Sequence, residues 1–140
     1  MTDIFPSEKR REIMRRIRSR GTKPEMEIKR MLDEMGIGYI YQAKLELDGK
    51  KRTVDFLIPS RRLVIEYRDC FWHYCNRCYK KPPVKGGIKG QEWWERKLRR
   101  NRERDRELEE LLKKHGYRLV VIWRHDKKRM REILEEALRA

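Results

Sequence analysis

Residues 39–67 read YIYQAKLELDGKKRTVDFLIPSRRLVIEY, and this segment predicts three consecutive β-strands. Asp48-Gly49 readily takes the positive φ angles that a tight turn needs. The runs on either side, residues 39–47 and 52–58, are therefore predicted to form a β-hairpin. Residues 62–67 supply a third strand. The segment thus predicts most of a β-sheet.

Two helices are expected before this sheet. The first covers residues 7–18, within a basic N-terminal region, residues 1–20, that is suited to touch phosphate. The second runs from about residue 22 to residue 35. Thr22 suits its N-cap, and Glu25 stands at the third helical position, as in a capping box.

Three more elements are expected after the sheet segment. Apolar residues at helical spacing predict a long helix over residues 92–115, and residues 127–140 form an amphipathic helix. Residues 117–123 between them predict a buried strand. The resulting order, α-α-β-β-β-α-β-α, is typical of an α/β fold with a mixed sheet flanked by helices. The 140 residues fit one compact domain, residues 1–140.

The charge of the chain points to a polyanionic partner. Lys and Arg number 38 against 23 acidic residues, which leaves a formal charge of +15 and a strong positive field. Nucleic acid is favoured over an anionic membrane because the basic residues are spread along the chain. In addition, no segment approaches the roughly 20 apolar residues of a transmembrane helix. The alternative is a heavily solvated surface of the kind seen in thermophilic proteins.

Two terminal and loop features bear on where and how the chain acts. Residues 1–20 contain no apolar stretch of the kind that opens a signal peptide, so we expect a cytoplasmic protein. Residues 79–90 are rich in lysine, proline and glycine and poor in apolar residues. We expect them to form a flexible basic loop that becomes ordered on its partner.

All three cysteines lie in the string Cys-Phe-Trp-His-Tyr-Cys-Asn-Arg-Cys, residues 70–78. In a reducing compartment this clustering favours metal binding over a disulfide. Cys75 and Cys78 have the spacing with which two thiolates grip one zinc ion, and Cys70 is a third candidate ligand. The fourth is either His125, which follows the predicted strand 117–123, or His73. The alternative is three small buried thiols without a metal.

Two carboxylates and a histidine suggest hydrolytic chemistry. We expect Asp55 and Glu66 near the C-terminal ends of neighbouring strands, where two carboxylates can hold a magnesium ion. Arg68 faces the same side of its strand as Glu66. This spacing approximates the Asp...Glu-x-Lys pattern of many restriction-type nucleases. His73 can take a proton from an attacking water near neutral pH.

The aromatic residues Phe71 and Trp72 precede this histidine. They can wedge between bases or stack on them, which would hold a distorted duplex. The alternative is that both are ordinary core aromatics.

Several blocks of residues fall in order with one family: Glu25, Asp55, the string Cys70-Phe71-Trp72-His73, the pair Trp93-Trp94 and residues 101–105, which read NRERD. In these blocks the chain resembles the very-short-patch-repair (Vsr) DNA mismatch endonucleases, over about residues 7–125. The resemblance implies a restriction-endonuclease-like fold and an enzyme that nicks one DNA strand 5′ of the thymine in a T:G mismatch. It also implies magnesium at the active site and a separate structural zinc ion.

The resemblance also implies a role for each matching residue. Asp55 would ligate magnesium, His73 would act as general base on water, and Glu25 would support the site. The residues that would intercalate beside the mismatch are Met14, Phe71 and Trp72. The zinc ligands would be Cys70, Cys75, Cys78 and His125.

The partner implied by the same resemblance is double-stranded, mismatched DNA. Arg15 in the first helix and Lys85 in the basic loop are expected to hold its phosphates. Other mismatch-repair proteins are expected as further partners. The expected location is the prokaryotic cytoplasm, in association with the nucleoid.

Residues 66–69 depart from the family pattern. Arg68-Asp69 stands where the family has His-Gly or Asp-Gly, and Glu66 stands where some members have an apolar residue. Arg68 cannot act as a base at neutral pH, but it can stabilise charge on a phosphate. Three alternatives therefore stay open: a related nuclease with another DNA specificity, a catalytically silent zinc-dependent DNA-binding module, and an RNA-binding protein that stacks bases on its aromatic residues.

Overall fold

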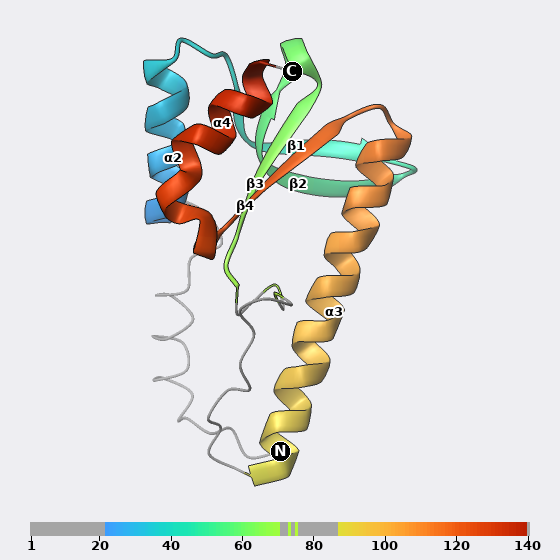
Figure 1. The fold of residues 1–140 in the computed structure, drawn as a ribbon. Coiled ribbons are helices and arrows are strands. Elements are labelled where there is room, and N and C mark those ends of the chain that lie inside the picture. Colours follow the sequence, from blue (N-terminus) through green and yellow to red (C-terminus); the bar gives the residue numbers. More distant parts are fainter. Residues whose placement is uncertain (1–21, 71–72, 74, 76–86, 140) are drawn as a thin grey trace, which may run out of the picture.

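Four strands form one mixed β-sheet in the order β1-β2-β3-β4. Strand β1 (Ile40–Leu47) pairs antiparallel with β2 (Lys50–Ile58), and β2 pairs antiparallel with β3 (Leu63–Arg68). Strand β4 (Arg118–Trp123) lies parallel to β3. The predicted mixed sheet between helices is confirmed (Figure 1).

The computed structural model describes residues 22–70, 73, 75 and 87–139. The expected basic helix of residues 1–20 lies outside the described residues, as does most of the expected basic loop. The same holds for these individually predicted residues: Met14, Arg15, Phe71, Trp72, Cys78 and Lys85.

Helices cover both faces of the sheet (Figure 1). Helices α2 (Lys23–Glu34) and α4 (Met130–Arg139) lie together on one face, where their apolar side chains pack against those of the strands. The long helix α3 (Gly87–Lys114) crosses the other face and connects β3 to the parallel strand β4. A crossover of this kind is what parallel neighbours require.

The two faces carry separate apolar clusters. On the α2 and α4 face, Ile28, Leu32, Phe56, Ile65 and Leu134 are each fully buried. On the α3 face, the cluster includes Ala43, Leu47, Val54, Val64, Leu108 and Leu112. Each fully buried Leu, Ile or Phe contributes roughly 1.5–3 kcal/mol relative to an exposed side chain. The first cluster therefore holds α2 and α4 against the sheet, and the second holds the C-terminal half of α3 against the other face.

Three boundaries differ from the prediction. Helix α3 begins at Gly87, so residues 87–90 of the predicted loop 79–90 are helical. Once a helix has started, each added residue gains a hydrogen bond, and this offsets the cost of a glycine. The final helix begins later than predicted, at Met130, after the 3₁₀ segment η2 (Arg124–Arg129). Strand β4 begins at Arg118, one residue later than predicted. It is mostly half-buried, with Ile122 fully buried, because it is an edge strand of the sheet that the described residues form.

The hairpin of β1 and β2 changes face at Gln42. Ala43 and its partner Val54 pack toward α3, whereas Tyr41 and its partner Phe56 pack toward α2 and α4. Gln42, between them, has the left-handed φ of 52°, which is unusual for a residue other than glycine. This change of face places the next residue of β2, Asp55, at the border between the two sides of the sheet.

None of the helices in the described part of the chain is both long and apolar enough to cross a membrane.

Candidate active site

Asp55 and Glu66 meet in the middle of the sheet. The register of β2 and β3 pairs Phe56 with Ile65, and this pairing places Asp55 beside Glu66 on the next rung. As expected, each residue lies toward the C-terminal end of its strand, and the two strands are neighbours. Because β2 and β3 run antiparallel, cross-strand register is what brings the carboxylates together. The Asp55 Oδ2 atom accepts a hydrogen bond from the backbone N–H of Tyr67 at 2.9 Å.

The two carboxyl groups have strongly perturbed titration. Burial, followed by the charge of Glu66 and then that of Glu25, raises the pKa of Asp55. Burial also raises the pKa of Glu66, and the nearby guanidinium of Arg68 opposes that shift. Paired buried carboxylates favour protons or a cation over two bare negative charges. The pair is therefore a chemically suitable site for a divalent cation.

Glu25 lies next to this pair, where it raises the pKa of Asp55, and it also accepts hydrogen bonds from α2 and β1. Its carboxylate accepts from both the backbone N–H and the hydroxyl of Thr22, each at 2.9 Å, and it is 3% exposed. The predicted capping box at the start of α2 is thus confirmed. The Tyr41 hydroxyl at 3.3 Å and the Gln42 amide at 3.4 Å also donate to it. Glu25 therefore ties α2 to β1 directly behind Asp55.

His73 is held by an aspartate from α3. Its Nδ1 atom lies 2.7 Å from Asp105 Oδ2, and the histidine side chain keeps 32% exposure. When Nδ1 carries the proton and donates it to Asp105, Nε2 is the nitrogen that can accept a proton from water. The sequence analysis assigned Asp105 no role of its own. A signal existed, because Asp105 stands seven residues from both Leu98 and Leu112, on the buried stripe of its helix.

Arg68 extends from β3 toward the same side of α3. Its side chain is 3% exposed, and Nη1 donates to Glu109 Oε1 at 2.7 Å. The Nε atom lies 3.9 Å from Asp105 Oδ2. A cavity of about 140 Å³ separates this guanidinium from the basic residues of α3, and its lining includes His73 and Trp123. The base candidate and the buried cation therefore share one recess.

Three of the four predicted zinc ligands come together. The Sγ atoms of Cys70 and Cys75 lie 3.3 and 3.7 Å from His125 Nδ1, and all three ligand atoms are within 4.8 Å of one another. Separations of this size fit neighbouring ligands of a tetrahedral ion with bonds of about 2.0–2.3 Å. Cys78 lies outside the described residues. His73 does not belong to this group, so the geometry favours His125 as the nitrogen ligand.

The orientation of the His125 ring suits metal binding. Its Nδ1 atom faces the two sulfurs, while Nε2 lies 3.5 Å from Asp126 Oδ2. A carboxylate on the far nitrogen is the usual support for a metal-binding histidine, because it fixes the tautomer and the direction of the ring. Thiolate and imidazole are also the donors that zinc prefers. These residues therefore fit a structural zinc ion.

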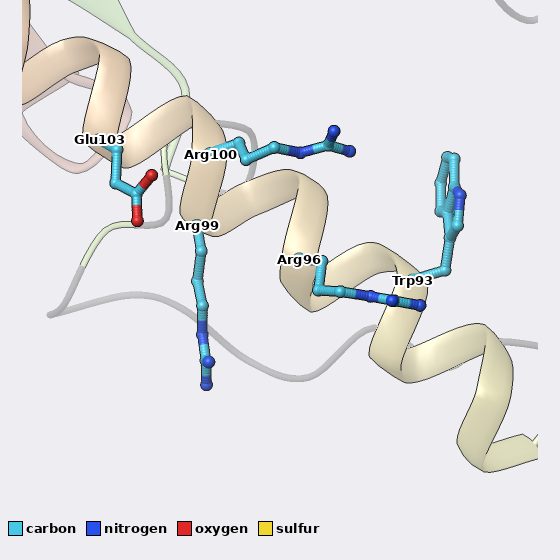
Figure 2. Close-up of a pocket in the computed structure, with 5 residues that line it drawn as sticks. All are labelled: Trp93, Arg96, Arg99, Arg100 and Glu103. Atoms are coloured by element: carbon cyan, nitrogen blue, oxygen red, sulfur yellow. The ribbon is translucent and has the colours of Figure 1, made fainter.

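A basic surface runs along α3 on the side that faces away from the sheet. Figure 2 shows Trp93, Arg96, Arg99, Arg100 and Glu103, which line a hollow of about 490 Å³. The ring of Trp93 lies 5.0 Å from that of its neighbour Trp94, edge to face. We call the four residues Trp93, Arg96, Arg99 and Arg100 the α3 basic face. It lies on the N-terminal half of the helix, which extends past the sheet (Figure 1).

Comparison with known proteins gives one consistent family. The family model for the DNA mismatch endonuclease Vsr matches residues 2–80. The chain is 34% identical over 123 residues to the type II nicking enzyme V.XorIIP of Xanthomonas oryzae, and the match covers 88% of this chain and 85% of that protein. It is 34% identical over 127 residues to the type II nicking enzyme V.NmeAIP of Neisseria meningitidis, with coverage of 88% and 82%. The DNA mismatch endonuclease Vsr of Escherichia coli is 30% identical over 140 residues, with coverage of 99% and 83%.

Proposed function

The chain belongs to the family of Vsr DNA mismatch endonucleases, and from that premise we propose that it nicks one strand of duplex DNA by hydrolysing a phosphodiester bond. The observation that carries the proposal is the pair of buried carboxylates, Asp55 and Glu66, which the register of β2 and β3 sets side by side. His73 is near enough for its charge to lower the pKa of Glu66. The pair supplies cation ligands, and His73 supplies a base in the same region of the fold.

Asp55 and Glu66 are the residues that would hold a magnesium ion. Magnesium binds by one or two carboxylates and completes its octahedron with waters and phosphate oxygens, and it would supply charge neutralisation at the reacting phosphate. The raised pKa values of both carboxyls support this assignment, because burial raises them by disfavouring the charged forms, and a bound cation offsets that cost. Glu25 supports Asp55 from behind through its bonds to Thr22 and β1.

His73 is the general base in this proposal. With Nδ1 engaged by Asp105, its Nε2 atom takes a proton from the water that attacks phosphorus. Asp105 acts through His73 as a positioning residue, since it fixes the ring and the tautomer. Arg68 stabilises the negative charge that develops on the phosphate. The charges of Arg68 and His73 both lower the pKa of the Glu66 carboxyl, which supports a joint role for the three residues.

A zinc ion held by Cys70, Cys75, Cys78 and His125 would stabilise the segment that carries His73. A backbone hydrogen bond of the kind that closes a turn joins two of these ligands, since the N–H of Cys75 donates to the carbonyl of Cys70 at 2.9 Å. Clamping that turn fixes the direction in which the intervening His73 leaves the backbone. Metal binding of this kind contributes directly to folding free energy.

Duplex DNA is the partner, and a T:G mismatch is the proposed target. The charge of +15 supports binding through phosphates. The residues that we propose to contact DNA are the α3 basic face together with Met14, Arg15, Phe71, Trp72 and Lys85. Contacts to phosphates position the protein without specifying sequence, so recognition of the mismatch falls to the aromatic residues. Other mismatch-repair proteins are proposed as further partners.

A nicking assay on matched, T:G-mismatched and branched duplexes, with and without magnesium, tests this function. We expect Asp55→Asn, Glu66→Gln and His73→Ala each to lower the rate by about 100-fold or more, in line with losses of general-base or charge-stabilising groups. Two variants serve as matched controls. Glu110→Gln changes an exposed position of α3, and His115→Ala changes the residue that follows the C-terminal end of this helix. Unchanged magnesium-dependent nicking in both Asp55→Asn and His73→Ala would show that the chemistry lies elsewhere.

The positioning role of Asp105 has its own test. Asp105→Asn removes the charge that holds His73 but leaves the metal carboxylates in place. We expect kcat to fall with little change in KM, because DNA binding does not use this residue. A fall in zinc content or a large loss of folding stability in the same variant would point to a structural role instead.

A further inference from the structure

The guanidinium of Arg68 is buried but only partly paired. Its Nη1 atom donates to Glu109, and its Nε atom lies 3.9 Å from Asp105 Oδ2, too far for a hydrogen bond. Among the described residues neither Nε nor Nη2 has a hydrogen-bond partner. Buried polar groups are normally satisfied, so two orphaned nitrogens on one side chain need an explanation. Nε and Nη2 form one edge of the planar fork. That edge is the one with which arginine grips two oxygens of a carboxylate or phosphate at once.

The cavity of about 140 Å³ beside this guanidinium is lined by further basic residues. Arg102 and Arg106, one turn apart on α3, border it together with His73 and Trp123. Its volume is well below the roughly 300–1,000 Å³ of pockets that enclose drug-sized ligands. It suits a single small anionic group and is too small for a nucleoside. Asp55 and Glu66 are not part of its lining.

Two acidic residues also border the cavity, and they behave differently. Asp105 is engaged by His73 at 2.7 Å and stays in place. The Glu109 side chain is 46% exposed, although its partner Arg68 is buried. A half-exposed glutamate can swing into solvent when a better anion arrives, and its present contact with Nη1 already demonstrates that this guanidinium attracts an oxyanion.

We propose that this cavity is a phosphate subsite, in which the Nε and Nη2 edge of Arg68 grips two oxygens of one phosphate group and Arg106 approaches from α3. The inference rests on the proposed nicking function and deepens it, because it gives the phosphate on which Arg68 acts a defined place beside the base. The ligand chemistry is a phosphate group, either a diester within the strand or the 5′-terminal phosphate of a nicked strand. The cavity holds a phosphate of the DNA backbone, and no DNA base enters it.

The experiment uses inorganic phosphate as the probe, with the zinc-loaded full chain and no added magnesium. Phosphate affinity is measured by calorimetry and by the rise of the melting temperature, with chloride at equal ionic strength as reference. Arg106→Gln and Arg68→Lys should each weaken the affinity by about tenfold, the loss expected for one hydrogen bond to a charged group. Lys113→Gln, which removes one charge from an exposed position on the same helix, should retain wild-type affinity.

A second arm separates the two sources of the group. Nicked duplexes that differ only in a 5′-phosphate or a 5′-hydroxyl at the nick are compared for binding. Tighter binding of the phosphorylated nick, lost in Arg106→Gln, assigns the subsite to the terminal phosphate. Equal binding of the two nicks, with both weakened in Arg106→Gln, assigns it to a diester of the strand.

Two results would overturn the subsite. One is equal phosphate affinity in wild type, Arg106→Gln and Arg68→Lys. The other is an effect of phosphate no greater than that of chloride. The outcome is separable from that of the nicking proposal, because phosphate binding needs neither magnesium nor Asp55. Asp55→Asn should therefore bind phosphate normally. If this variant bound phosphate normally and also nicked DNA at an undiminished rate, the proposed catalysis would be refuted and the phosphate subsite would stand.

Discussion

Replacing Asp55 by asparagine should stabilise the metal-free protein at neutral pH, even though it should abolish nicking. Burial, before the charge of Glu66, raises the pKa of Asp55 from its ordinary value of 3.8 to about 9. The folded protein therefore keeps a proton that the unfolded chain releases. The stability from such a group is fully present below about pH 4 and is lost as pH rises from there through the raised value. Asparagine carries no charge and still offers an oxygen to the Tyr67 N–H.

The magnitude follows from the size of the shift. Each pKa unit corresponds to about 1.4 kcal/mol. The value of pH 7 lies about three units above the ordinary pKa of 3.8. At pH 7 this one carboxyl therefore lowers the free energy of unfolding by up to about 4 kcal/mol. Asp55 keeps partial exposure, so solvent offsets part of that penalty. We expect a gain of about 2 kcal/mol in the variant, which for a domain of this size raises the melting temperature by roughly 5–10 °C.

Thermal unfolding between pH 5 and pH 8 measures the effect, with zinc bound and magnesium absent. The melting temperature of Asp55→Asn should exceed that of the wild type by a margin that grows with pH. Magnesium should then stabilise the wild type and leave the variant unaffected. Asp33→Asn, an exposed aspartate on α2, is the control. A variant that is less stable than the wild type at pH 8, or a margin that is the same at both ends of the range, would refute the reasoning.

Three other predictions concern the supports of the site. Glu25→Ala should lower the free energy of unfolding in urea by about 2–3 kcal/mol, because it removes a cap and leaves buried donors unpaired. Glu27→Ala on the same helix is the control, and an equal loss of stability in both variants would contradict a special role for the cap. Cys75→Ser should abolish stoichiometric zinc binding by metal analysis and lower the melting temperature, whereas His115→Ala should do neither; a zinc content equal to the wild type would remove the site. Substituting Arg96, Arg99 and Arg100 together by glutamine should weaken duplex binding. The slope of log affinity against log salt should fall by about 2–3, since each phosphate contact contributes about 0.9. An unchanged slope would show that the α3 basic face does not touch DNA.

Local pattern was sufficient to predict the elements of the described fold. The turn at Asp48-Gly49, the capping box at Thr22 and Glu25 and the leucine stripe of α3 each depend on residues a few positions apart. The residues at which helices begin were harder to predict from the sequence. The early start at Gly87 and the 3₁₀ segment before Met130 reflect packing and helix propagation, and neither leaves a strong mark on composition.

The site was harder to predict than the elements, because its geometry depends on long-range packing. Asp105 reaches His73 across 32 positions of sequence, and Glu109 reaches Arg68 across 41. Both acidic residues come from α3, and their contacts follow from how that helix crosses the sheet. The sense of the β2 and β3 pairing was not assigned from the sequence, although the link between the two strands is short. A parallel pair would have needed a long crossover, so the antiparallel sense could have been predicted.

The position of Asp55 explains why the site stands where it does. The paired register of β2 and β3 extends from Ile58 and Leu63 to Phe56 and Ile65. One rung further, the Asp55 carboxylate accepts the N–H of Tyr67, in a place where a backbone carbonyl would otherwise serve. A side chain thus takes over from the backbone at the point where the hairpin changes face, near Gln42 of β1. Keeping this carboxyl protonated at neutral pH costs stability, whereas its hydrogen bond contributes stability. Asparagine separates the two contributions, because it keeps the bond and needs no proton.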